Sequence, residues 1–220
     1  MRPLLITIDG PAGAGKTTVS KELARRLGYR YVDTGALYRG VALAAMEQGV
    51  AADDDKGLEA LCRGLTLKFV ADTEGTRLFS GDRDISGLIR TSEISMMASA
   101  VSARPVVRQF LFGLQRRLGE EKRAVFEGRD MGTVVFPEAD VKFFLDASVE
   151  ERARRRYNER PASEPRTLKE IEEEIRVRDH NDRTRSHAPL KPAEDAVLLD
   201  STALSIEQVV DAMVARIPLD

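Results

Sequence analysis

The stretch Leu4-Leu-Ile-Thr-Ile-Asp-Gly-Pro-Ala-Gly-Ala-Gly-Lys-Thr17 decides the fold of this chain. Its first part, Leu4–Ile8, is a short apolar run that ends at Asp9, which is typical of a buried parallel strand. Its second part, Gly10–Thr17, matches the pattern G-x-x-x-x-G-K-[ST] in full, and residues 18–27 then keep their apolar positions on one helical face. A strand, this loop and a helix in that order predict a site for the phosphates of a nucleotide.

The residue types in the loop explain how it would hold phosphate. Glycines let successive backbone N–H groups turn inward, and the following helix adds the positive end of its dipole. Lys16 is predicted to reach the β- and γ-phosphates, and the Thr17 hydroxyl is predicted to bind Mg²⁺. The residues predicted to hold the nucleotide are Gly10, Pro11, Ala12, Gly13, Ala14, Gly15, Lys16, Thr17 and Thr18. The alternative is a glycine-rich turn that binds nothing.

Strand and helix patterns alternate along the chain on either side of a different kind of segment. Further strands are predicted at 31–33, 124–126, 141–145 and 196–199, and further helices at 37–48, 92–102, 106–118, 148–160, 167–185 and 205–217. Capping boxes are predicted at Ser148 with Glu151 and at Thr167 with Glu170. This alternation predicts an α/β fold with a parallel central sheet covered on both faces. Residues 65–85 instead show short β-like runs between turn signals, which indicate a small antiparallel insert.

The composition limits the class of protein. The 220 residues include 34 Lys and Arg against 36 Asp and Glu, so the net charge of −2 provides no global basic field for a nucleic acid polymer. The single cysteine, Cys62, allows no disulfide within the chain, which fits a reducing cytoplasm. No stretch approaches the roughly 18 apolar residues of a membrane span, so no membrane association is expected.

Polar clusters follow two of the predicted strands, where a parallel sheet presents its ligands. Thr34 and Arg39 come after the second strand, where Thr34 could cap the next helix and Arg39 could meet an anion. Arg129 and Asp130 lie in a glycine-bracketed turn after the strand at 124–126. An ordinary helix start and a structural ion pair are the respective alternatives.

A third cluster lies on the predicted helix 167–185. Arg178, Asp182 and Arg185 are four and three residues apart, which puts them on one helical face. The alternative is a solvated charged face, unless an anion lies opposite. Arginines are also dense around residues 161–166, and guanidinium groups there could close over a nucleotide. These arginines are Arg152, Arg154, Arg155, Arg156, Arg160 and Arg166, of which about half are expected only to keep the surface soluble.

Together these motifs resemble the bacterial cytidylate kinase family. The resemblance rests on ITIDGPAGAGK at 6–16, DTGALYR at 33–39, GRDMGTVVFP at 128–137 and FLDAS at 144–148, and it covers essentially the whole chain. It implies ATP with Mg²⁺ as phosphate donor, CMP and dCMP as acceptors, and CDP and dCDP as products. It also implies a P-loop NTPase fold of three layers with a core, a lid and an acceptor-binding insert, and it suggests a monomer. The expected limits are 1–63, 105–150 and 186–220 for the core, about 64–104 for the insert and about 151–185 for the lid.

The resemblance also implies a role for individual residues. The implied acceptor residues are Thr34, Arg39, Arg90, Ser99, Arg108, Arg129, Asp130, Arg178, Asp182 and Arg185. Among these, Arg39 and Arg129 would meet the acceptor phosphate, and Arg178 and Asp182 would meet the ribose. Ser99, Arg108 and Asp130 would read the cytosine edge, where a carboxylate can accept from the amino group. Lys16, Arg129 and Arg185 are the implied catalytic residues.

The implied chemistry requires little of the protein beyond positioning and charge stabilisation, so no side chain is expected to become phosphorylated. Two other hypotheses remain at this stage. One is a kinase of the same fold with UMP, AMP or a small metabolite as acceptor, which the pair Arg108 and Asp130 disfavours. The other is a nucleotide-binding regulator without turnover. A GTPase switch is disfavoured because the motif N-K-x-D is absent.

Overall fold

The computed structural model describes residues 2–72, 75–159 and 166–218, and the chain forms two compact units. The first unit contains residues 1–31 and 121–220, and the second contains residues 32–120. The resemblance instead divides the chain by function into a core, an insert and a lid. The limits of these three parts stay a prediction. Arg160 and all but the last residue of the loop predicted at 161–166 lie outside the described residues.

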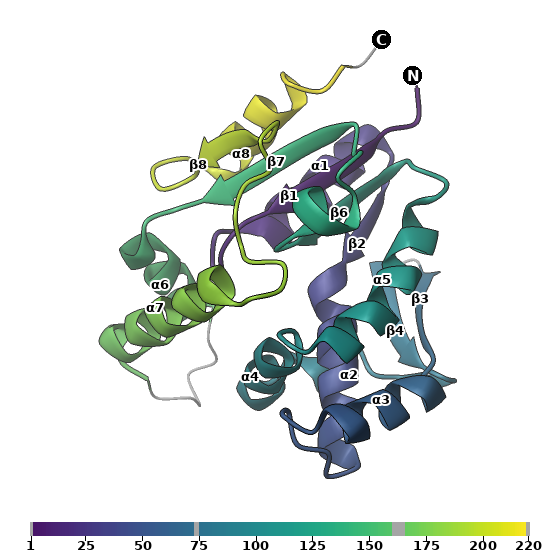
Figure 1. The fold of residues 1–220 in the computed structure, drawn as a ribbon. Helices are drawn as coiled ribbons and strands as arrows, with labels where there is room; N and C mark the ends of the chain where they lie inside the picture. Colours follow the sequence, from purple (N-terminus) through teal and green to yellow (C-terminus); the bar gives the residue numbers. More distant parts are fainter. Residues whose placement is uncertain (1, 73–74, 160–165, 219–220) are drawn as a thin grey trace. The chain divides into compact units, whose positions relative to one another are not determined.

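A parallel sheet forms the centre of the first unit. Among the described residues its five strands follow the order β2-β6-β1-β7-β8, with β1 parallel to both β6 and β7, and β7 parallel to β8 (Figure 1). The strands are β1 (Leu5–Asp9), β2 (Arg30–Asp33, which crosses into the second unit), β6 (Ala124–Gly128), β7 (Val141–Asp146) and β8 (Val197–Asp200). The helices of this unit are α1 (Lys16–Leu27), α6 (Val149–Asn158), α7 (Leu168–Thr184) and α8 (Ile206–Val214), with a π-helical turn at Met131–Val135. The predicted α/β class and parallel central sheet are therefore confirmed.

The burial of β1 explains its apolar sequence. All five residues of β1 are buried, as expected for an inner strand with a neighbour on each side. Ile6 and Ile8 share a core with Val19 and Leu23 of α1 and with residues of α8. This core fixes the strand and the helix that precede and follow the glycine-rich loop, so the loop has a rigid support at both ends.

Helices α6 and α7 form a pair in the same unit, and Figure 1 shows them side by side. Their contact is a small apolar cluster that contains Ala153, Ile171 and Ile175. The predicted capping box at the start of α7 is confirmed, because the Thr167 hydroxyl accepts from the Glu170 amide and the Glu170 carboxylate accepts from the Thr167 amide. These contacts set where α7 begins.

The second unit is mainly helical. It contains α2 (Thr34–Glu47), α3 (Asp55–Gly64), the 3₁₀ turn Leu88–Arg90, α4 (Ser92–Val101) and α5 (Pro105–Gly119), together with β3 (Leu67–Asp72), β4 (Gly75–Ser80) and β5 (Arg83–Asp84). The three strands pair antiparallel in the order β3-β4-β5, so the predicted antiparallel segment is confirmed. Leu37 and Val41 of α2 pack with Leu67 and Leu78 of the strands in one core.

Two predicted caps differ in the structure. Thr34 was expected to cap the helix after β2, but Asp33 is the N-cap residue, and its carboxylate accepts from the Ala36 amide at 3.0 Å. Thr34 is the first residue of α2, because Asp33 already provides the oxygen that accepts from the first turn. Ser148 does cap α6 through the Glu151 amide, but the Glu151 carboxylate pairs with arginines instead of completing a capping box.

Candidate active site

The glycine-rich loop between β1 and α1 has a backbone that only glycine adopts easily. Gly15 is the N-cap of α1 with φ of 84°, in the left-handed region. Gly10 has φ of +152°, and a Cβ atom there would lie 1.9 Å from the carbonyl oxygen of Leu145 on β7. Strand β7 therefore approaches the loop so closely that position 10 has no room for a side chain.

The lysine of the loop is buried. Lys16 is 6% exposed, and its Nζ donates to the carbonyl oxygen of Pro11 at 2.7 Å. Burial lowers the pKa of Lys16 well below its usual value, and the positive charges of Arg129 and Arg178 lower it further. The carboxylates of Glu127 and Asp9 act on the pKa of Lys16 in the opposite direction, so Lys16 lies among charges of both signs.

A carboxylate faces the hydroxyl that was predicted to bind Mg²⁺. The Thr17 hydroxyl donates to one oxygen of Glu127 at 2.9 Å, and the Tyr31 hydroxyl donates to the other oxygen at 2.9 Å. Glu127 is the fourth residue of β6 and is 7% exposed. Hydroxyl and carboxylate oxygens are the ligands that Mg²⁺ prefers, so Thr17 and Glu127 together fit this ion.

Another buried carboxylate holds the turn after β6. Asp9, the last residue of β1, accepts from the amide of Met131 at 2.9 Å and from the amide of Gly132 at 2.7 Å. Burial raises the pKa of Asp9 to about 6, against the effect of these two hydrogen bonds. Asp9 therefore fixes the backbone directly after Arg129 and Asp130.

The residues of the turn meet two of the three residues predicted on one helical face, which are Asp182 of α7 and Arg185, the residue directly after α7. Nε of Arg129 lies 3.0 Å from Oδ2 of Asp182, and Nη1 of Arg185 lies 3.9 Å from the other oxygen of Asp182. Nη2 of Arg185 also lies 3.7 Å from Oδ1 of Asp130. The side chains of Asp130, Asp182 and Arg185 are 7% exposed or less. The alternative of a solvated charged face is therefore wrong for this part of α7.

The cluster has an excess of positive charge. Burial works to raise the pKa of Asp182, but the charges of Arg129, Arg178 and Arg185 outweigh it and hold that pKa below its usual value. Asp182 is therefore ionised at neutral pH and orders the guanidinium groups around it. The charges of Arg129 and Arg178 also act on the pKa of Lys16. The phosphate loop and the arginine cluster are therefore taken together as one candidate anion site.

In the second unit, two of the predicted acceptor arginines meet at one carboxylate. Nη1 of Arg39 lies 3.5 Å from Oδ2 of Asp33, and Nη2 of Arg90 lies 3.9 Å from the same oxygen. Thr34, next to Asp33, is 2% exposed. The unit thus places Arg39 and Arg90 together, although they are 51 residues apart in sequence.

The other two predicted acceptor residues of this unit are linked through Ser102. Nη1 of Arg108 donates to the carbonyl oxygen of Ser102 at 3.3 Å, and the Ser102 hydroxyl donates to the carbonyl oxygen of Ser99 at 2.8 Å. The guanidinium of Arg108 also lies over the ring of Tyr38, 5.9 Å from its centroid. The guanidinium of Arg108, which belongs to the first turn of α5, is therefore held by the C-terminal end of α4 and by the face of the Tyr38 ring.

Two of the arginines that are dense around residues 161–166 in the sequence donate to the phosphate loop. Arg152 donates to the carbonyl oxygen of Ala12 at 3.1 Å, and Arg155 donates to that of Ala14 at 3.4 Å. Arg156 and Arg166 pair with Glu174 of α7, and Arg154 pairs with Glu151. The helical spacing of Arg152 and Arg155 puts both on the side of α6 that faces the loop.

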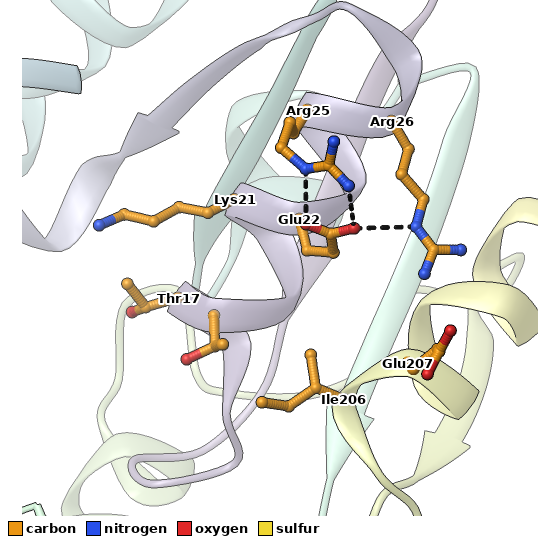
Figure 2. A pocket seen from close by; sticks show the side chains of 8 residues that line it. Thr17, Lys21, Glu22, Arg25, Arg26, Ile206 and Glu207 are labelled. Carbon is orange, nitrogen blue, oxygen red and sulfur yellow. Dashed lines mark hydrogen bonds and ion pairs between the residues drawn. The ribbon is translucent and has the colours of Figure 1, made fainter. Parts of the chain in front are cut away.

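An open cavity of about 650 Å³ adjoins the start of α1. Figure 2 shows that Thr17 and Lys21 of α1 and Ile206 of α8 line it, with Lys21 extending away from the group that Glu22 forms with two arginines. The lining residues are Thr17, Thr18, Lys21, Glu22, Arg25, Arg26, Ile206 and Glu207. The cavity offers room for a ligand beside the phosphate loop.

Three residues of the site were not assigned a role from the sequence. Asp9 ends an apolar strand, and Glu127 lies in the segment that contains Arg129, so their positions at strand ends were an available signal. Tyr31 carried no such signal, because its role depends on where its hydroxyl lies relative to Glu127.

Comparison with known proteins shows the family to which the chain belongs. The cytidylate kinase family model matches residues 6–219. A cytidylate kinase of Geobacter sp. strain M21 is 53% identical over 211 residues, which are 96% of this chain and 91% of that protein. One of Citrifermentans bemidjiense is 52% identical with the same shares covered. Among solved structures, a shikimate kinase of Bacteroides thetaiotaomicron is 14% identical with a TM-score of 0.53 and 98% of each chain covered, which shows a shared fold.

Within the described residues, every helix is too short or too polar to cross a bilayer. The family match covers nearly the whole chain, and the relatives at about half identity carry the same family name. The chain therefore belongs to the cytidylate kinase family and is a nucleotide-binding kinase that phosphorylates nucleoside monophosphates.

Proposed function

We propose that this protein transfers the γ-phosphoryl group of ATP to CMP and dCMP, giving CDP and dCDP. The observation that carries the proposal is the buried Lys16 at the end of the phosphate loop, in the same unit as Arg129 and Arg185, which Asp182 holds together. Positive charge placed in this way would stabilise two phosphate groups and the charge that develops between them. Family membership supports the choice of cytidine nucleotides as acceptors.

The donor's phosphates would be held by residues 10–18. Glycine-rich loops of this kind can turn their amide groups inward, and the dipole of α1 would add positive potential. Lys16 would bind the β- and γ-phosphates. Thr17 and Glu127 would hold Mg²⁺, which when bound neutralises charge on the phosphates. The cavity beside Thr17 and Thr18 supports binding of further parts of ATP next to the loop.

We propose the residues that bind the acceptor separately for each of the two units. In the first unit, Arg129 would bind the acceptor phosphate, Asp130 would accept from the cytosine amino group, and Arg178 with Asp182 would meet the ribose. In the second unit, Arg39 would bind the acceptor phosphate and Thr34 and Arg90 would also contact the acceptor. Ser99 and Arg108 of that unit would contact the base.

The residues would act by positioning and by charge rather than by covalent chemistry. An acceptor phosphate oxygen would attack the γ-phosphorus in line, and Lys16, Arg129 and Arg185 would stabilise the transition state. Exclusion of water by the lid, proposed for residues 151–185, would protect the phosphoryl group from hydrolysis. We further propose that the protein acts in the cytoplasm, as a monomer, in pyrimidine nucleotide metabolism.

A panel of acceptors tests this function. ADP release from ATP and Mg²⁺ is measured with CMP, dCMP, UMP, AMP and water as acceptors, with the Lys16→Met variant as a blank. We expect CMP and dCMP to give the highest kcat/KM values. Higher kcat/KM values for UMP or AMP would contradict the proposal that CMP and dCMP are the acceptors. ATP binding without any acceptor-dependent ADP release would contradict the proposal that the protein transfers a phosphoryl group.

A further inference from the structure

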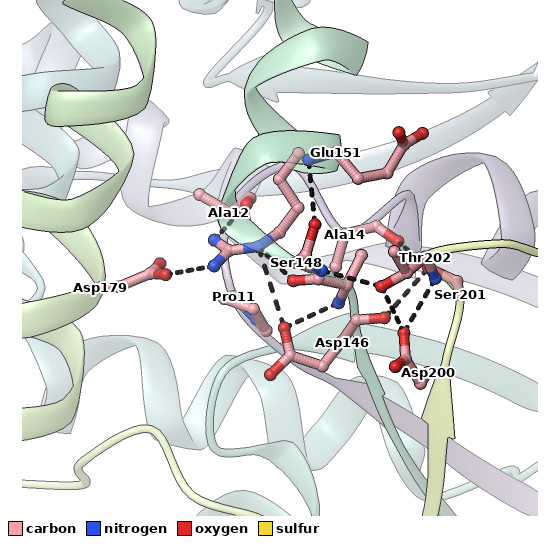
Figure 3. A network of polar contacts seen from close by, with 12 residues as sticks. Pro11, Ala12, Ala14, Asp146, Ser148, Glu151, Asp179, Asp200, Ser201 and Thr202 are labelled. Atoms are coloured by element: carbon pink, nitrogen blue, oxygen red, sulfur yellow. Dashed lines mark hydrogen bonds and ion pairs between the residues drawn. The ribbon is translucent and has the colours of Figure 1, made fainter. Parts of the chain in front are cut away.

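Arg152 is a buried arginine that joins three segments of the first unit. It is 2% exposed, and its Nε donates to the carbonyl oxygen of Ala147 at 2.8 Å, just beyond β7. Its Nη1 donates to the carbonyl oxygen of Ala12 in the phosphate loop at 3.1 Å. Its Nη2 forms an ion pair of 2.7 Å with Asp179 of α7. Figure 3 shows Ala12, Asp146 and Asp179 on different sides of this network.

The burial of this guanidinium requires all of these partners. A buried charge costs free energy unless it is paired and hydrogen-bonded. Asp179 supplies the nearest negative charge, and Asp146 lies 3.8 Å from Nε. Within the described part of the chain, Oδ1 of Asp179 accepts no hydrogen bond, so the pair with Arg152 is the principal polar contact of that carboxylate.

The bond to Ala12 fixes the direction of one peptide group in the loop. In a trans peptide the C=O and the following N–H point in opposite directions. Because the Ala12 carbonyl points toward Arg152, the N–H of Gly13 points away from it. A Cβ atom on Gly13 would lie 3.1 Å from both Cβ and the carbonyl oxygen of Arg152, so the loop lies directly against α6 at this point. Arg155 holds the Ala14 carbonyl in a similar way.

The bond to Asp179 links this peptide group to α7. Asp179 is 8% exposed, directly follows Arg178 and precedes Asp182 by three residues. The helix that carries the arginine and aspartate cluster therefore also positions the guanidinium behind the phosphate loop. A shift of α7 would move Arg152 and release the Ala12 carbonyl.

We propose that Arg152 is a positioning residue for the donor nucleotide, which holds the Ala12–Gly13 peptide in the orientation that binds phosphate, and that Asp179 sets its position. This inference rests on the proposed function. It assigns Arg152 to the rear of the loop, whereas a lid arginine would contact ATP directly. It also makes the affinity for ATP depend on Asp179, which reaches the loop through Arg152.

The test separates positioning from a general effect on stability. Asp179→Asn keeps the size of the side chain but removes its charge, and it leaves Arg152 without its nearest counter-ion. The double variant Arg152→Met with Asp179→Leu removes both charges, so no buried charge is left unpaired, and such apolar replacements can preserve stability. Arg176→Gln is the matched control, because Arg176 also pairs α7 with α6, through Glu150, but at the surface.

ATP binding is measured by calorimetry without acceptor at a temperature at which circular dichroism shows each variant folded, and melting temperatures are recorded in parallel. We expect Asp179→Asn to lower the melting temperature and to weaken ATP binding about tenfold, the usual size for one charge-assisted hydrogen bond. We expect the double variant to melt near the wild-type temperature and still to bind ATP about tenfold more weakly. Arg176→Gln should bind ATP as the wild type does, and KM for CMP should change little in all three.

Wild-type ATP affinity in Asp179→Asn, or in a double variant of wild-type melting temperature, would overturn the inference and leave Arg152 a purely structural residue. If the KM for CMP rose in a variant by the same factor as ATP binding weakened, the inference would also be overturned. That result would indicate a general loosening of the structure. If the double variant does not fold, the Asp179→Asn titration decides. Wild-type protein that bound no ATP would overturn the proposed function together with this inference, whereas the variant results bear on the inference alone.

Discussion

Nε of Arg129 donates to Oδ2 of Asp182 at 3.0 Å, so two residues that the sequence suggested as separate contacts to the acceptor hold one another. Asp182 is buried, and it also lies 3.9 Å from Arg185. The carboxylate therefore orders the arginines of the site in addition to any contact with the ribose. This arrangement changes what a substitution of Asp182 should do.

Asp182→Asn should raise the KM for CMP and for dCMP by about tenfold or more, because Arg129 loses the charged partner that orients it. A larger increase for CMP than for dCMP is expected from a direct contact with the 2′-hydroxyl. Initial rates with both acceptors at saturating ATP measure this. Glu173→Gln, an exposed change on the same helix, is the control. Unchanged KM values for both acceptors would remove Asp182 from the site.

Lys16→Met should lower kcat by about 100- to 1000-fold, because removal of one preorganised positive group from a site of developing charge costs about that much. The fold should persist, since the methionine side chain fills a similar buried space. Stopped-time assays of ADP formation and circular dichroism measure both effects. Arg63→Gln, an exposed change on α3, should leave kcat unchanged. Turnover near the wild-type rate in Lys16→Met would reject the role of Lys16.

Tyr31→Phe should raise the Mg²⁺ concentration needed for half-maximal activity by about threefold to tenfold, because Glu127 loses the hydroxyl that holds one of its oxygens. Calorimetric titration of Mg²⁺ into the protein with a non-hydrolysable ATP analogue provides a readout independent of turnover. The control is Tyr29→Phe, whose hydroxyl contacts only the backbone of Arg2 and Leu4 among the bonds described. Equal Mg²⁺ requirements for the two variants would contradict the role of Tyr31.

Asp9→Asn should change how stability depends on pH. The pKa of Asp9 is raised to about 6, so between pH 4 and pH 6 the folded protein keeps a proton that the unfolded chain releases. The contribution of Asp9 to stability therefore falls as the pH rises through this range and stays constant above it. Because asparagine does not titrate, the unfolding free energy of the variant relative to wild type should rise by about 2 kcal/mol from pH 4 to pH 7.

Urea unfolding of both proteins at several pH values measures this difference, and the exposed change Asp211→Asn serves as the control. A difference between Asp9→Asn and wild type that stays flat across the range would show that Asp9 titrates normally.

Gly10→Ala should lower the unfolding free energy by about 3 kcal/mol, because the new Cβ would lie 1.9 Å from the Leu145 carbonyl oxygen. Gly64→Ala is the matched control, since a Cβ at the end of α3 meets nothing within 4 Å. That variant should be as stable as wild type or up to about 1 kcal/mol more stable. Similar unfolding curves for the two variants would contradict the close approach of β7 to the loop.

The sequence by itself determined the fold class and the phosphate loop. The apolar run before Gly10, the glycine pattern and the amphipathic run after Thr17 are local signals, and each follows from backbone freedom or from periodic burial. The antiparallel segment around residues 65–85 and the capping box at Thr167 were equally local, and both are present.

Only the tertiary structure decided which charged residues act together. Spacing put Arg178, Asp182 and Arg185 on one helical face, but whether that face was solvated depended on Arg129 and Asp130, which lie about 50 residues earlier in the chain. The density of arginines around Arg152 likewise gave no sign that Arg152 lies behind the phosphate loop. The physical reason is that hydrogen bonds and ion pairs act over a few ångströms in space, so the partner of a charged side chain is set by how helices and strands pack, and local sequence does not contain that information.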